Sequence, residues 1–76
     1  MNLTEDERAR LADIMDDLAN DAWLHVKHFS GAYAECVVND YDEEQILVDV
    51  NYGIETEGRH YTDYISIDRE TMTVVN

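Results

Sequence analysis

The chain has 76 residues, 45% of them hydrophobic, and a net charge of −13 from 18 Asp and Glu against five Lys and Arg. This size predicts one domain, residues 1–76, with a small core. The acidity excludes direct binding to nucleic acid and to anionic membranes, and no apolar run approaches the roughly 20 residues that span a bilayer. One cysteine excludes an internal disulfide, and the acidic first residues are unlike a signal peptide, which predicts a cytoplasmic protein.

Residues 4–30 have the pattern of one long amphipathic helix. Thr4 and Glu7 have the spacing of a capping box, and acidic residues fill the first turn, where the helix dipole favours negative charge. Gly31 suits the left-handed position after the helix. The apolar residues fall on one stripe at helical spacing: Leu11, Ile14, Met15, Leu18, Ala22, Val26 and Phe29.

The second half of this helix has an alternative. Trp23 and Leu24 fall off the apolar stripe, and Asn20 suits a helix end. Residues 23–29 would then form a strand. Because its alternation would put His25 on the same face as Trp23, we expect the continuous helix instead.

Strands are predicted for the rest of the chain. The clearest covers residues 46–54, where Ile46, Val48 and Val50 alternate with polar residues. Polar turns separate it from further strands at residues 32–38, 60–68 and 72–75. Because the turns are short, consecutive strands should be antiparallel neighbours. The sequence therefore predicts an α+β fold, in which one N-terminal amphipathic helix packs on a four-stranded antiparallel β-meander.

A register can be proposed for this sheet. All inward-facing residues fall on one face when Val50 pairs with Ile65, Val48 with Ile67, Ile67 with Met72, Ile65 with Val74 and Cys36 with Val48. The last pairing would place Glu35 opposite Asp49. Two close carboxylates suit acid–base chemistry or a hard cation, but like charges directly opposite each other are disfavoured, so we do not expect this pair.

No residue set has the complete spacing of a catalytic or metal site. His25 and His28 are zinc-ligand types and would need Cys36 or His60 to complete a site, but the helix phase turns the two histidines apart. Cys36 is expected to face inward beneath the helix, where thiols are usually inert. We therefore predict no enzymatic activity, no cofactor and no metal.

The charge pattern of the helix is the most informative feature for function. Seven carboxylates lie between Glu5 and Asp21. At about 1.5 Å per residue this is roughly one charge per 3.4 Å, the charge spacing of a single nucleic-acid strand. The predicted partner-binding residues are the acids opposite the apolar stripe and three tyrosines as anchors: Asp6, Asp13, Asp16, Asp17, Asp21, Tyr33, Tyr41 and Tyr64.

Two functional hypotheses follow. The first is a small acidic interaction protein that binds and blocks a basic, nucleic-acid-binding surface of a partner protein. In size and charge alone, the chain is similar to small phage proteins that inhibit CRISPR or restriction systems, some as DNA mimics. The alternative is a structural or oligomerising domain whose acidity serves solubility or halophilic adaptation. An uncovered sheet face predicts a homodimer through exposed apolar side chains: Tyr33, Val37, Leu47, Tyr64 and Val75.

Overall fold

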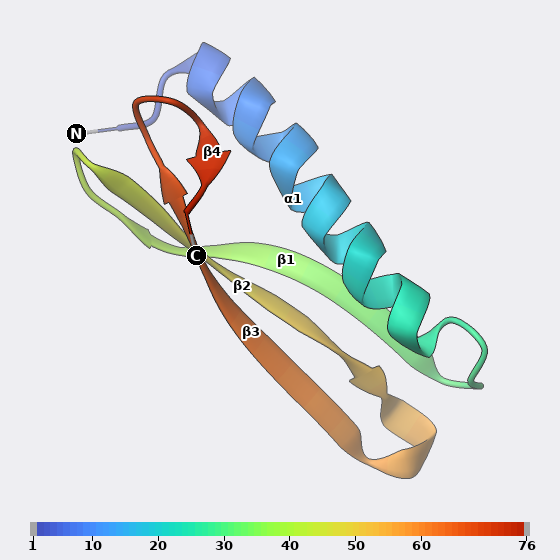
Figure 1. Ribbon diagram of the computed structural model, residues 1–76. Coiled ribbons are helices and arrows are strands. Elements are labelled where there is room, and N and C mark those ends of the chain that lie inside the picture. The colour runs from blue at the N-terminus through green and yellow to red at the C-terminus, as the bar shows by residue number, and fades with distance from the viewer. Residues whose placement is uncertain (1, 76) are drawn as a thin grey trace.

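The computed structural model describes residues 2–75 and consists of one helix packed along one face of a four-stranded antiparallel sheet (Figure 1). The strands follow one another in the order β1-β2-β3-β4, which is a meander. The predicted α+β fold is therefore confirmed. The elements are α1 Glu5–Val26, β1 Ala32–Tyr41, β2 Gln45–Ile54, the 3-10 turn η1 Glu55–Glu57, β3 Arg59–Asp68 and β4 Thr73–Val74.

The helix α1 begins with the expected capping box. The Thr4 N–H donates to Glu7 Oε1 over 2.9 Å, and the Glu7 N–H donates to Thr4 Oγ1 over 3.1 Å. These bonds satisfy backbone donors that have no partner inside the helix. The helix then continues without interruption past Trp23, so the alternative with a strand over residues 23–29 is wrong.

The helix ends earlier than predicted. Its last residue is Val26, Lys27 is the C-cap, and the Phe29 N–H donates to the Val26 carbonyl over 3.0 Å. Gly31, at φ 81°, then directs the chain into β1, and glycine adopts this conformation without steric cost. Phe29 is 47% exposed, so its assignment to the buried stripe is wrong. Phe29 is exposed because residues 27–31 form the turn that connects the helix to the sheet.

The core lies between α1 and the inner face of the sheet. Ile46, Val48 and Ile67 are completely buried, and Leu11 of the helix packs on them. The alternation predicted for β2 is therefore correct in phase. Part-buried side chains of the helix stripe and the inner face surround this cluster: Ile14, Met15, Leu18, Cys36 and Ile65.

The predicted register is wrong by two residues, although the inward faces are right. Val48 pairs with Ile65 and Val50 pairs with Cys36. Likewise Ile67 pairs with Ile46 and, on its other side, with Val74 instead of the expected Met72. A shift of two residues keeps every side chain on its face, because the strand repeat is two. The turns decide between such registers, and hydrophobic alternation does not.

The β1 strand is longer than predicted because it contains a bulge. Asn39 is an extra residue between Val38 and Asp40, and the strand continues to Tyr41, so the polar turn expected after residue 38 begins later. The Asn39 side-chain amide donates to both carboxylate oxygens of Asp49, over 3.1 and 3.2 Å. A bulge of this kind bends and twists a strand locally.

The molecule is elongated, with extents of 40 × 19 × 17 Å, and α1 runs along its length (Figure 1). The twisted sheet leaves its second face without a covering layer among residues 2–75. No helix in the described part of the chain is long and apolar enough to cross a membrane.

Candidate protein-binding surface

The outer face of α1 is acidic along most of its length. The predicted helix residues are all exposed: Asp6, Asp13, Asp16, Asp17 and Asp21. Asp16 and Asp21 stand at the two sides of the helix, where they border hollows shared with the sheet. Asp6 is 3.4 Å from Arg10, one turn away. Within residues 2–75 the other four form no ion pair. Their charge is therefore available to a partner.

Glu7 does not belong to this exposed row. Arg69 Nε donates to Glu7 Oε2 over 2.7 Å, and Arg69 Nη2 donates to Glu7 Oε1 over 3.1 Å. These bonds, with that from the Glu7 N–H to Thr4, hold the pKa of Glu7 at about 2. The pair is bidentate, the strongest geometry for an arginine and a carboxylate. Glu7 is therefore not available to a partner, and the row of helix carboxylates predicted to match the spacing of phosphates has one carboxylate fewer.

Arg69 connects three distant segments of the chain. Its guanidinium is 7% exposed and donates to the carbonyl oxygens of Asp42, over 2.8 Å, and Asn2, over 3.1 Å. Its backbone N–H donates to the Glu44 carbonyl over 3.0 Å. The guanidinium carbon lies 5.7 Å from the centre of the Tyr41 ring. The β1–β2 turn, the β3–β4 turn and the start of α1 are thereby joined.

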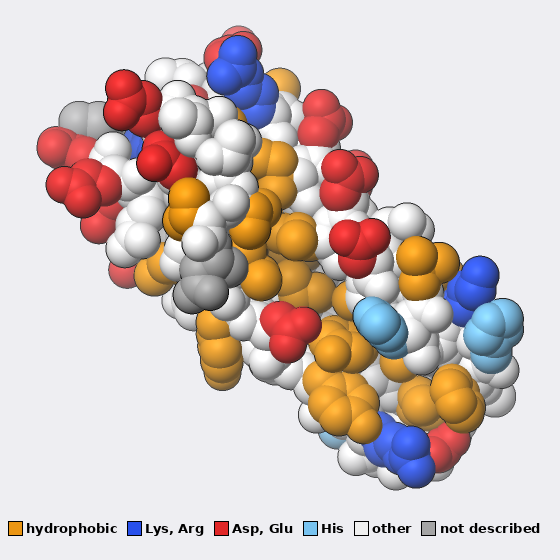
Figure 2. Space-filling model, in the orientation of Figure 1, with side chains coloured by type: hydrophobic (Ala, Val, Ile, Leu, Met, Phe, Trp, Pro, Cys, Tyr) orange, Lys and Arg blue, Asp and Glu red, His pale blue; other side chains and the backbone are white. Residues whose placement is uncertain are grey.

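A cluster of carboxylates surrounds this junction, and we call it the acidic end. It comprises Asp42, Glu43, Glu44, Asp68 and Glu70. Figure 2 shows acidic side chains gathered where the N-terminal part of α1 meets the β1–β2 turn, and others along the helix. These residues were not among those predicted to form a site. The signal was present, because the β1–β2 and β3–β4 turns of a meander lie at the same end of the sheet.

The opposite end of the molecule is less negative, because Lys27 and Arg59 lie there with Glu55 and Glu57. Arg8, Arg10 and Arg69 lie toward the acidic end, where carboxylates outnumber them. Figure 2 shows histidines and basic side chains at the opposite end, with an acidic side chain among them. Near them Tyr52 stacks on Tyr61, with ring centres 5.3 Å apart, and His25 lies 6.4 Å from Tyr52. The charge of the protein is therefore polarised along its long axis. A positively charged partner meets the strongest attraction at the acidic end and along α1.

The three predicted tyrosines do not join the acidic helix face. Tyr33 and Tyr64 lie on the sheet face opposite α1, where Tyr64 is 72% exposed and Tyr33 Oη lies 2.7 Å from His60 Nδ1. Tyr41, expected in a turn, ends β1 and is half-buried beneath Arg69. The structure therefore separates the acids from the aromatic residues that were predicted to anchor the same partner.

The uncovered sheet face is a mixed surface. Val37, Asp49 and Tyr64 form one row across β1, β2 and β3. In the next row, Glu35 pairs with Asn51. The exposed apolar side chains expected at a dimer interface are thus interleaved with polar ones. The Glu35–Asp49 carboxylate pair does not form, because the register places these residues two positions apart.

Cys36 is half-buried on the inner face of β1. Burial, and then the nearby Asp49 charge, raise the pKa of its thiol above the usual value. A nucleophilic cysteine needs the thiolate, so this environment favours an unreactive packing role. Across residues 2–75, no three His, Cys, Asp or Glu side chains stand close enough together to hold a metal ion.

Comparisons with protein families, with curated proteins and with solved structures found no match to this chain.

Proposed function

We propose that this chain is a small acidic interaction protein that binds and blocks a basic surface of a partner protein. The partner surface is one that otherwise holds the phosphates of a nucleic acid, as in a protein of a phage defence system. The main support is the exposed carboxylates of Asp13, Asp16, Asp17 and Asp21 on α1, which form no ion pair within residues 2–75, together with the acidic end. A reducing compartment such as the cytoplasm is proposed with it, since the thiol of Cys36 is free.

Electrostatics determine how such a complex should behave. Complementary charges mainly accelerate association, so binding should be fast. Salt should weaken it, because the Debye length falls about threefold between about 50 and about 500 mM salt. Nucleic acid should compete for the same partner, since both ligands present rows of negative charge to one groove.

The first test removes the charge of the helix face. The triple variant Asp13→Asn, Asp16→Asn, Asp17→Asn should bind a partner captured from the natural host at least about tenfold more weakly than the wild type. Its melting temperature should be unchanged or higher, because the change relieves self-repulsion. Affinity is measured with the purified partner by calorimetry, with and without competing DNA.

The control removes charge elsewhere. Glu55→Gln with Glu57→Gln neutralises two exposed carboxylates of η1, at the opposite end from the acidic end. This variant should keep nearly full affinity. If the triple variant and the wild type bound the partner with equal affinity across the salt range, the acidic face of α1 would have no role in binding and the proposal would be wrong.

A second candidate function has a specific observation in its favour. All three turns between strands carry exposed acids, including Glu43, Glu55 and Glu70. This distribution is expected of a halophilic or highly soluble structural domain, because such adaptation spreads carboxylates over the whole surface. A halophilic protein should need molar salt to fold, whereas the interaction protein should melt cooperatively in dilute buffer. A salt titration of the melting temperature separates them.

The oligomerising form of this alternative makes its own prediction. A homodimer through the uncovered sheet face would bury Val37, Leu47 and Tyr64. Light scattering should then return a dimer mass at high micromolar concentration and moderate salt, and Val37→Lys with Tyr64→Lys should return a monomer. A monomer mass for the wild type under these conditions would exclude the dimer.

A further inference from the structure

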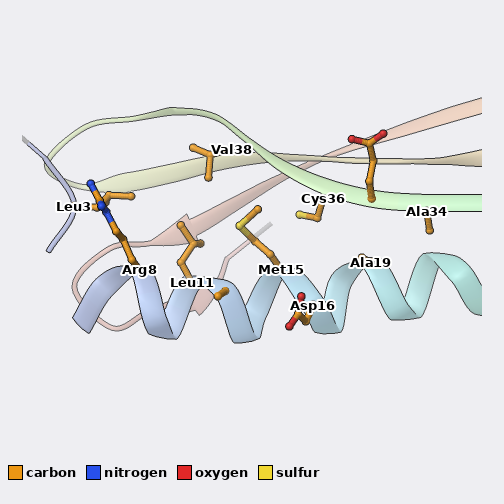
Figure 3. A pocket seen from close by; sticks show the side chains of 11 residues that line it. Leu3, Arg8, Leu11, Met15, Asp16, Ala19, Ala34, Cys36 and Val38 are labelled. Carbon is orange, nitrogen blue, oxygen red and sulfur yellow. The ribbon is translucent and has the colours of Figure 1, made fainter. Parts of the chain in front are cut away.

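An apolar groove runs between α1 and β1. Its volume is about 600 Å³. Figure 3 shows Leu11 and Met15 of the helix on one side and Cys36 and Val38 of the strand on the other. The groove stays open because Ala19 and Ala34 are too small to fill it. Open apolar volume of this size is typical of sites that receive side chains of a ligand.

The β1 strand borders this groove and is an edge strand. It pairs with β2 on one side only, so every second residue directs its N–H and C=O away from the sheet. The bond from the Glu55 N–H to the Gly31 carbonyl, 2.9 Å long, sets the phase of the ladder. By this alternation Glu35 bonds to β2, whereas Ala34 and Cys36 present free backbone groups. The residues with free backbone groups are thus the ones whose side chains face the groove.

We propose that the groove and the free edge of β1 together bind an extended segment of a basic partner protein, which adds to the sheet as a fifth, antiparallel strand. The segment has apolar side chains at alternate positions and Lys or Arg between them. This inference rests on the proposed function and specifies how the partner is held. Alternate residues of an added strand point to one face, so its apolar side chains enter the groove while its backbone bonds to β1.

The charges around the groove select a basic segment. Asp16 lines it from the helix side and Glu35 from the strand side, and neither has an ion pair within residues 2–75. Arg8 is the only cation among the lining residues and stands beside Leu3 at one end (Figure 3). The basic residues alternate with the apolar ones, so they point to the uncovered face of the sheet, on which Glu35 lies. Asp16 attracts the segment from the helix side of the groove over a longer range. The net charge of −13 adds attraction over a longer range.

A second copy of this chain is a poor occupant of the same groove. If two β1 strands paired, Ala34 and Cys36 of each copy would face the groove of the other and leave it largely unfilled. Two chains of charge −13 would also repel each other. A basic partner segment with larger apolar side chains avoids both costs.

The test uses a synthetic peptide as long as β1 in which Leu or Val alternates with Lys. Two derivatives carry N-methyl groups, one on the amides of the apolar residues and the other on the amides of the lysines. In an antiparallel fifth strand the apolar residues bond to β1 and the lysine amides face solvent. Methylation of the apolar amides should therefore weaken binding about tenfold or more, and methylation of the lysine amides by much less. Binding is measured by fluorescence anisotropy.

Two readouts on the protein accompany this experiment. The amides of Ala34, Cys36 and Val38 should gain protection from hydrogen exchange when the unmodified peptide binds. Ala34→Ile, which fills the groove with a strand-favouring side chain, should weaken peptide binding while keeping or raising the melting temperature. The wild-type protein with a peptide of alternating Ser and Lys controls for charge alone.

The outcomes separate this inference from the proposed function. Equal binding of the two methylated peptides, no binding of the unmodified peptide, or a dimer of the chain formed through β1 would overturn strand addition. The acidic-face proposal would still stand if the captured partner required Asp13, Asp16 and Asp17. Conversely, a captured partner indifferent to these residues would overturn the proposed function.

Discussion

Val48→Asp is expected to leave the chain unfolded at neutral pH. Val48 is completely buried between β1, β3 and the helix, and it belongs to the core cluster with Ile46 and Ile67. A carboxylate there loses its hydration and finds no partner, which costs several kcal/mol. A domain of this size has a total stability of roughly 4–11 kcal/mol. The substitution should therefore remove most or all of it.

The matched control adds the same charge to the other face of the sheet. Val37 is 40% exposed and pairs with Asp49, so Val37→Asp should cost about 1 kcal/mol from like-charge repulsion. Circular dichroism and urea titration of the two variants measure the difference. A Val48→Asp variant that melts like the wild type would show that the inward face of β2 is misassigned.

Arg69→Ala should produce the second large effect. It leaves the Glu7 carboxylate and the carbonyl of Asp42 without their donor and opens the junction of the two turns with the start of α1. We expect a clearly lower melting temperature and rapid amide exchange in the β1–β2 turn and the first turn of α1. The control is Arg8→Ala, which removes an exposed arginine of the same region. It should change the melting temperature and the amide exchange rates little.

The same ion pair predicts a dependence on pH. The pKa of Glu7 is about 2 in the folded protein, below its ordinary value of 4.5. A carboxyl with a lowered folded pKa contributes stability that is complete above its unfolded pKa and is lost as the pH falls toward the folded pKa. The difference in melting temperature between wild type and Glu7→Gln should therefore be constant above about pH 5 and shrink between about pH 4.5 and about pH 2. A difference that stays constant down to pH 2 would contradict the assigned role of Glu7.

The comparison with Glu7→Gln is needed because the protein has 18 acidic residues. Acid also protonates the other carboxylates and relieves their mutual repulsion, which stabilises the folded chain. This effect is common to both proteins, so it cancels in the difference. The melting temperature of the wild type alone would not isolate the Glu7–Arg69 pair.

The sequence alone determined the type and order of the helix and strands and, apart from Phe29, their buried faces. The spacing of Leu11, Ala22 and Val26 established the helix, and the alternation at Ile46, Val48 and Val50 established the central strand. These patterns are local, because a residue's face depends only on the repeat of its own element. The short turns then left the meander as the simplest order of strands.

Only the tertiary structure decided the register, the role of Arg69 and the groove. The register depends on how each turn closes. The bulge at Asn39 shifts the β1–β2 pairing by one residue, and Gly58 and Met72 adopt left-handed conformations in the next two turns. Hydrophobic alternation detects neither feature. Arg69 contacts Glu7 across a separation of 62 residues, and no local pattern records such a contact. The groove exists because small side chains from two elements face each other across a free strand edge, which depends on the position of the helix above the sheet.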